Sequence, residues 1–70
     1  MNNLNIRETE TYKNLTSYDA VGLAEGFVEG SQDEQIAAWQ WLHDTRTAYS
    51  LQGWFGRTAT NLIENGIILE

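Results

Sequence analysis

The sequence predicts an all-α fold, a small three-helix bundle with a polar N-terminal segment and a short apolar C-terminal tail. Three observations lead to this prediction. Apolar residues recur at helical spacing in three stretches, serine and glycine stand between those stretches, and the 70 residues contain no proline. We divide the chain into residues 1–16, a flexible or short helical segment, and residues 17–70, a three-helix domain.

The first helix is predicted over residues 18–29. Ser17 is a suitable N-cap, and Asp19 in the first turn interacts favourably with the helix dipole. Gly30 follows as the residue that ends the helix. The predicted apolar face comprises Ala20, Leu23, Ala24, Phe27 and Val28.

Two further helices are predicted after Ser31. The second runs to about Thr45, and Ser31 and Glu34 have the spacing of a capping box. The third begins near Thr47 and ends at Asn65-Gly66, after which the apolar tail of residues 67–69 is expected to fold back on the bundle. The core positions predicted in these helices are Ile36, Trp39, Leu42, His43, Ala48, Leu51, Phe55, Ala59, Leu62 and Ile63.

Three glycines of the first helix, Gly22, Gly26 and Gly30, lie four residues apart. This spacing stacks them on one helix face and allows another part of a backbone to approach closely. Since glycine in a helix interior costs roughly 0.5–1 kcal/mol relative to alanine, the first two need a reason to be there. Close packing within the monomer is the favoured interpretation, and a docking groove is the alternative.

The eight aromatic residues are more than a chain of this length readily buries. Trp39 and Trp41 point about 200° apart on a helix, so we predict Trp39 inward and Trp41 outward. By the same period, Phe55 faces the core and Trp54 faces away, where Arg57 can lie over its ring as a cation–π pair. Trp41 and Trp54 then either form a binding surface or are half-buried beneath the two chain ends.

The charge balance excludes several classes of partner. Ten acidic and four basic residues give a net charge of −6. Four scattered bases form no phosphate-binding patch, so we expect no direct binding to nucleic acid or to an anionic membrane. The acidity fits a basic surface on another macromolecule, and it fits general solubility at least as well. With neither a signal-like N-terminus nor a long apolar stretch, we expect a cytoplasmic protein.

The residues that carry enzyme chemistry are scarce. There is no cysteine, and His43 is the one histidine. His43 and Asp44 are adjacent on a helix and therefore do not face each other as a catalytic pair. No phosphate loop or calcium-loop spacing is present. We expect no catalytic, cofactor-binding or metal site, and we expect His43 to be a boundary residue with its hydrogen bonds satisfied.

Several sequence blocks resemble a family of very small bacteriophage proteins of unknown function. The resemblance spans residues 17–68 and rests on the blocks DAVGLAEG (19–26), AWQWL (38–42) and LQGWFGRTA (51–59). Two positions depart from the family pattern: Arg46 stands where glycine is usual, and His43 stands where an aliphatic residue is usual. The family has no established catalytic residues, so the resemblance implies a phage origin and no chemistry.

These observations lead us to expect a non-enzymatic phage accessory protein that binds a host protein in the host cytoplasm and modulates or inhibits it. Tryptophan and arginine dominate binding hot spots. The expected contact surface is therefore Trp41, Trp54 and Arg57, ringed by Asp44, Glu25 and Glu29. One alternative is an acidic nucleic-acid mimic that blocks a DNA- or RNA-binding protein. The other is a homo-oligomeric structural component, in its simplest form a homodimer.

Overall fold

The computed structural model describes residues 5–70, and within them it contains helices and no strand. The prediction of an all-α fold is therefore confirmed. The elements, in chain order, are η1 (Ile6–Glu8), α1 (Glu10–Lys13), α2 (Ser17–Glu25), α3 (Gln32–Asp44), η2 (Thr47–Tyr49) and α4 (Gly53–Glu64).

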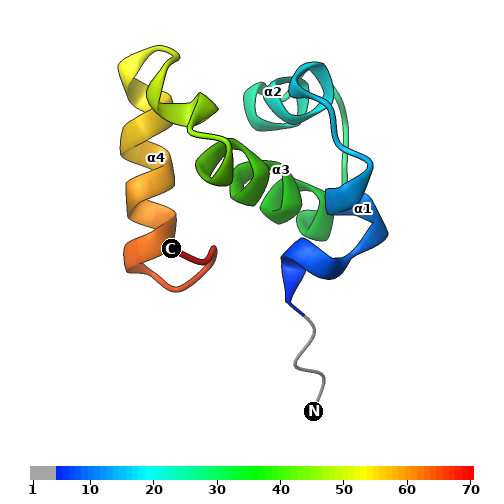
Figure 1. Cartoon of the computed structure of the whole chain (residues 1–70). Coiled ribbons are helices and arrows are strands. Elements are labelled where there is room, and N and C mark those ends of the chain that lie inside the picture. Colours follow the sequence, from blue (N-terminus) through cyan, green and yellow to red (C-terminus); the bar gives the residue numbers. More distant parts are fainter. Residues whose placement is uncertain (1–4) are drawn as a thin grey trace.

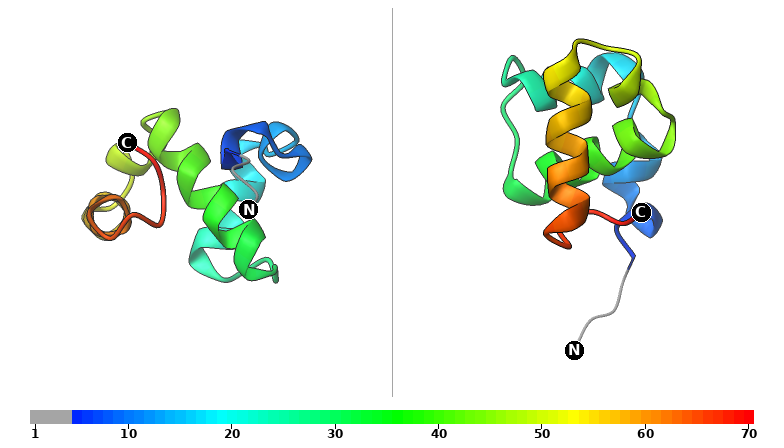
Figure 2. Two further views of the ribbon diagram at one scale, coloured as in Figure 1. Left: turned by 90° about the horizontal axis from the view of Figure 1, so that it is seen from below. Right: turned by 90° about the vertical axis from the view of Figure 1, so that its left-hand side faces the viewer.

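Helix α3 is the centre of the fold, because every other helix contacts it. It crosses the middle of the molecule, with α4 on one side and α1 and α2 on the other (Figure 1). The view from below shows the same order, with α3 between α4 and the N-terminal helices (Figure 2). The main core cluster of buried side chains joins α2, α3, η2, α4 and the tail: Ala20, Leu23, Ala38, Trp39, Leu42, Ala48, Phe55, Ala59 and Ile68.

Helix α2 is shorter than the predicted helix over residues 18–29. Thr16, and not Ser17, is its N-cap, and the Thr16 hydroxyl accepts a hydrogen bond from the Asp19 N–H at 3.2 Å. The helix ends at Gly26, which has a left-handed φ of 84°. The N–H of Phe27 then donates back to the Gly22 carbonyl at 2.9 Å. The predicted end of this helix at residue 29 is wrong, because the apolar residues continue at helical spacing beyond Gly26, where the helix stops.

The predicted stack of three glycines on one helix face is wrong, because α2 ends at Glu25 and leaves Gly26 and Gly30 outside it. The space beside Gly22 and Gly30 is filled by other side chains of the same chain. A Cβ on Gly22 would lie 2.7 Å from Cγ2 of Val28, and a Cβ on Gly30 would lie 2.5 Å from Cδ2 of Leu23. Both distances are too short for a real contact. Gly22 and Gly30 therefore allow close packing within the monomer, which is the interpretation that the sequence favoured.

Helix α3 begins with the predicted capping box. The Ser31 hydroxyl accepts from the Glu34 N–H at 3.1 Å, and the Ser31 N–H donates to the Glu34 carboxylate at 2.8 Å. After the helix, Arg46 adopts a φ of 66°, the one positive φ of a non-glycine residue in the described part of the chain. This left-handed conformation is one that favours glycine.

The third predicted helix is interrupted. Residues 47–49 form the short η2, and α4 begins only at Gly53. Leu51 lies in the break and is 38% exposed, so its predicted core position is wrong. The end of α4 is as predicted, with Asn65 as C-cap and Gly66 at a φ of 72°. The tail folds back and buries Ile68 in the core.

Candidate partner-binding surface

Trp41 and Trp54, the two tryptophans predicted to face a partner, are half-buried against the core. The Trp54 ring stacks on Phe55 with the ring centroids 4.0 Å apart. It also meets the edge of Trp39 at a centroid distance of 6.2 Å. These contacts make Trp54 a member of an aromatic cluster that holds α4 on α3, which is a packing role.

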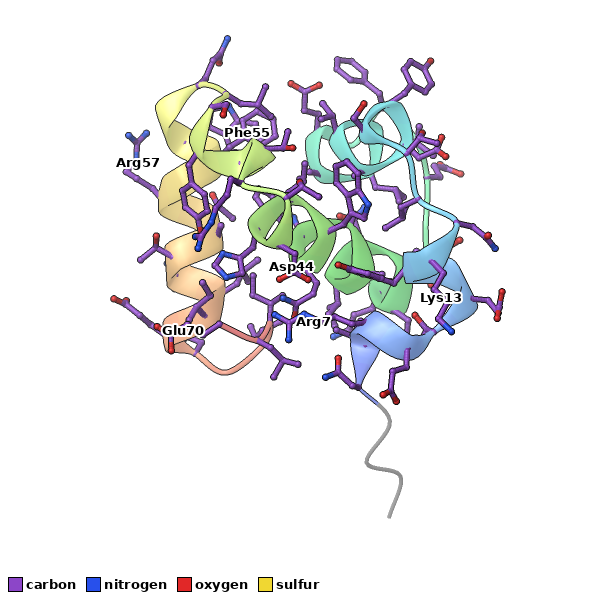
Figure 3. All side chains as sticks on the ribbon, in the orientation of Figure 1. Arg7, Lys13, Asp44, Phe55, Arg57 and Glu70 are labelled. Atoms are coloured by element: carbon purple, nitrogen blue, oxygen red, sulfur yellow. The ribbon has the colours of Figure 1, made fainter. Side chains whose placement is uncertain are left out.

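Arg57 projects from the outer side of α4 (Figure 3). Its guanidinium lies back along the helix, so that Nη1 is 3.0 Å from the place where a Cβ on Gly53 would stand. The residue lines a groove of about 580 Å³ beside η2, together with Tyr49, Thr60 and Glu64. The predicted cation–π pair with Trp54 is wrong, because the Trp54 ring packs on its aromatic neighbours instead.

Asp44 lies at the end of α3 and is paired within the chain. Nε and Nη2 of Arg7 donate to its two carboxylate oxygens at 2.7 and 2.8 Å, a bidentate ion pair. The Tyr12 hydroxyl donates to the same carboxylate at 2.7 Å. Figure 3 shows Arg7 of η1 directly beside Asp44. The predicted role of Asp44 as an acid presented to a partner does not fit this placement, because its charge is neutralised internally.

Gln40 completes this network from one turn earlier on α3. Its side chain is fully buried, and its amide donates to the Leu69 carbonyl at 2.8 Å while its carbonyl accepts from the Leu69 N–H at 2.7 Å. It also donates to Asp44 at 3.2 Å. Arg7 adds a hydrogen bond to the Glu70 carbonyl at 3.1 Å. We name the side chains of Arg7, Tyr12, Gln40 and Asp44, with the backbone of Leu69, the terminal clasp.

The clasp changes the pKa of three of its members, and the hydrogen bond to Asp44 raises that of Arg7. Burial raises the pKa of Asp44, but hydrogen bonds from Arg7 and Tyr12 outweigh it and hold that pKa below its ordinary value. Burial, aided by the hydrogen bond to Asp44, raises the pKa of Tyr12 to about 12. Among the residues that the structure describes, no buried side-chain polar atom lacks a hydrogen-bond partner. The clasp is therefore a satisfied structural network that joins η1, α1 and the C-terminal residues to α3.

His43 is likewise satisfied within the chain. It is buried, its Nδ1 lies 2.6 Å from the Tyr49 hydroxyl, and the two rings meet edge to face. This hydrogen bond ties α3 to η2. The geometry agrees with a boundary histidine whose Nδ1 is hydrogen-bonded within the chain.

The two most exposed aromatic side chains lie elsewhere, on α2 and the loop that follows it. Tyr18 is 80% exposed and Phe27 is 84% exposed, the highest values among the large hydrophobic residues in the described part of the chain. They border a groove of about 560 Å³ between α2 and the η2–α4 connection, which we name the α2 groove. Its lining is Ser17, Tyr18, Val21, Gly22, Glu25, Phe27, Val28, Thr47 and Leu51.

Sequence reasoning missed this surface. It assigned Phe27 to the core of a longer helix and gave Tyr18 no role. Gly26 was the available signal, because a left-handed glycine there ends the helix and turns the next side chain outward. Among the predicted contact residues, Glu25 lines the α2 groove, and Glu29 lies in an adjoining hollow that shares Val28 with it.

The surroundings of the α2 groove are strongly acidic. Residues 14–43 contain five carboxylates and no lysine or arginine, so this stretch carries −5 of the net charge of −6. The remaining residues hold five acids and four bases, and that arithmetic leaves −1. Glu25, Glu29, Asp33 and Glu34 are exposed. The two most exposed aromatic rings, those of Tyr18 and Phe27, and most of the uncompensated negative charge therefore belong to the same part of the chain.

Other kinds of site find no support in residues 5–70. These residues contain no group of three or more histidine, cysteine or acidic side chains placed to hold a metal ion. None of their helices has the length and apolar character that crossing a bilayer requires. Comparisons of the chain with protein-family models, with curated proteins and with solved structures found no match.

Proposed function

We propose that this chain is a small non-enzymatic phage accessory protein that binds a host protein in the host cytoplasm and modulates or inhibits it. We propose further that the α2 groove is the surface through which it binds. The phage assignment rests on the sequence blocks over residues 17–68. The binding surface rests on the exposure of Phe27 and Tyr18.

The observation that carries the proposal is the 84% exposure of Phe27 beside an 80% exposed Tyr18. Fully burying one such side chain is worth roughly 1.5–3 kcal/mol, which this small chain forgoes at both positions when it folds. Rigid aromatic side chains beside a groove are typical of interface anchors. A bound protein would recover that burial.

The two alternative functions have weaker support. A nucleic-acid mimic needs free carboxylates, and Arg7 neutralises that of Asp44. A homo-oligomer built on the glycine face needs space beside Gly22 and Gly30, and Val28 and Leu23 fill it. Neither alternative accounts for the exposed aromatic rings.

Site-specific photo-crosslinking in host cells tests the proposal. The photoreactive residue p-benzoylphenylalanine is placed at position 27 of the full chain, and a matched variant carries it at exposed position 64 on α4. We expect one or a few host proteins to crosslink at position 27 and not at position 64. Equal patterns at both positions, or no host protein at position 27, would overturn the proposal.

A further inference from the structure

The charge around the α2 groove restricts what can occupy it. Glu25 lines the groove and Glu29 lies in the adjoining hollow. Asp19 and Glu34 border a third depression, which opens on a different face of α2. No lysine or arginine lines any of these three depressions. An occupant must therefore fit both the apolar floor of the groove and the negative charge at its rim.

Three kinds of occupant are disfavoured by this rim. A second copy related by a two-fold axis would bring the same acidic surface against itself, and such like-charge juxtaposition is unfavourable. An anionic bilayer and a nucleic-acid backbone would meet the same repulsion. A partner with positive charge beside apolar residues gains both attraction and burial.

The shape of the groove favours a helix. Tyr18, Val21 and Glu25 lie at i, i+3 and i+7 on α2, so the groove follows one helix face for two turns, about 10 Å. Gly22 allows Val28 to pack close to this face. A partner helix along α2 would place apolar side chains at i, i+3 or i+4, and i+7 between the rings of Tyr18 and Phe27, as in other helix-in-groove complexes.

We propose that the α2 groove binds a basic amphipathic helix of the partner protein, with apolar side chains on the groove floor and lysine or arginine side chains facing Glu25 and Glu29. This inference rests on the proposed function, because it names the chemistry of the segment that the host protein contributes. Electrostatic complementarity of this kind sets specificity and the rate of association.

The test uses three labelled peptides of about 18 residues, long enough to form a helix. The first is a leucine- and lysine-based amphipathic helix, the second has glutamate in place of lysine, and the third is a scramble of the first. Fluorescence anisotropy measures their binding to the full chain. We expect the first peptide to bind, the second to show no binding, and the scramble to bind at least about tenfold more weakly.

Protein variants then locate the binding. Phe27→Ala should weaken the first peptide by at least about tenfold, whereas Ile67→Ala, an exposed apolar control outside the groove, should have no effect. Glu25→Gln with Glu29→Gln should weaken it about three- to tenfold and flatten its salt dependence. The matched pair Glu10→Gln with Glu64→Gln, which removes the same charge elsewhere, should change affinity less than twofold.

Each contrary result overturns the inference. If the scrambled peptide binds as tightly as the first peptide, the chain attracts positive charge alone. If the acidic peptide binds as tightly as the first, the acidic rim does not select for positive charge. An unchanged affinity of Phe27→Ala places the site elsewhere. The crosslinking experiment separates this failure from that of the proposed function. A host segment captured at position 27 that is not basic refutes the inference and leaves the function standing, whereas capture of no host protein refutes the function.

Discussion

Removing the Asp44 carboxylate should destabilise the fold strongly, because it accepts four hydrogen bonds in the terminal clasp. The donors are Nε and Nη2 of Arg7, the Tyr12 hydroxyl and the Gln40 amide, at 2.7, 2.8, 2.7 and 3.2 Å. A hydrogen bond to a charged group contributes about 1.5–3 kcal/mol when buried. The side chains of Arg7 and Asp44 are 32% and 19% exposed, so solvent screening reduces this sum.

We therefore expect Asp44→Ala to lower the free energy of unfolding by about 2–3 kcal/mol. In a domain of this size such a loss lowers the melting temperature by roughly 10–20 °C. Thermal and urea unfolding followed by circular dichroism at neutral pH measure the change. Glu64→Ala, an exposed acid on α4, is the control and should stay within about 0.5 kcal/mol of the wild type.

A double-mutant cycle isolates the ion pair from the rest of the clasp. Arg7→Ala and Asp44→Ala should show a coupling energy of about 1 kcal/mol, because the pair is bidentate and partly shielded. Since the pKa of Asp44 is lowered in the folded protein, its contribution to stability is present at pH values above the ordinary pKa of an aspartate. That contribution is lost as the pH falls through the folded-state pKa. A coupling of zero, or a melting temperature of Asp44→Ala within about 3 °C of the wild type, would refute this account of the clasp.

Three other variants test the fold. The pKa of Tyr12 is raised from 10.0 to about 12 in the folded protein, so the stability that its neutral hydroxyl contributes is present below pH 10 and is lost as pH rises through 12. In urea titrations the free energy of unfolding of the wild type should fall across that interval, and that of Tyr12→Phe should fall less. Gly22→Ala should cost about 1–2 kcal/mol through its clash with Val28, and should be neutral or stabilising in a Val28→Ala background. Trp54→Ala should cost about 2–4 kcal/mol in chemical denaturation, and an unchanged midpoint would mean that its aromatic contacts contribute nothing.

The parts of the fold that local sequence determines were predictable. The capping box at Ser31 and the stop at Asn65-Gly66 depend on residues within four positions of each other. The core positions of α3 and α4 follow from helical period, with Leu42 and Phe55 as examples. The cost of glycine inside a helix also identified Gly22 as a position of close packing.

The remaining features depend on contacts that are distant in sequence or on single backbone conformations. Arg7 lies 37 residues before Asp44, and Leu69 lies 29 residues after Gln40, so no periodicity reveals the clasp. The one local signal was the spacing of Gln40 and Asp44, which places two polar side chains on the same face of α3. Phe27 was assigned to the core because the left-handed conformation of Gly26 was not anticipated.

The most direct test of the central claim, that the α2 groove is the binding surface, is a nuclear magnetic resonance titration of the full chain with the basic amphipathic peptide. The backbone amide resonances of residues lining the groove should shift and saturate together, with Tyr18, Phe27 and Leu51 foremost. Resonances of the terminal clasp and of the outer face of α4 should stay in place. Shifts centred on Trp41 or Arg57, or spread evenly over all exposed acids, would contradict the account.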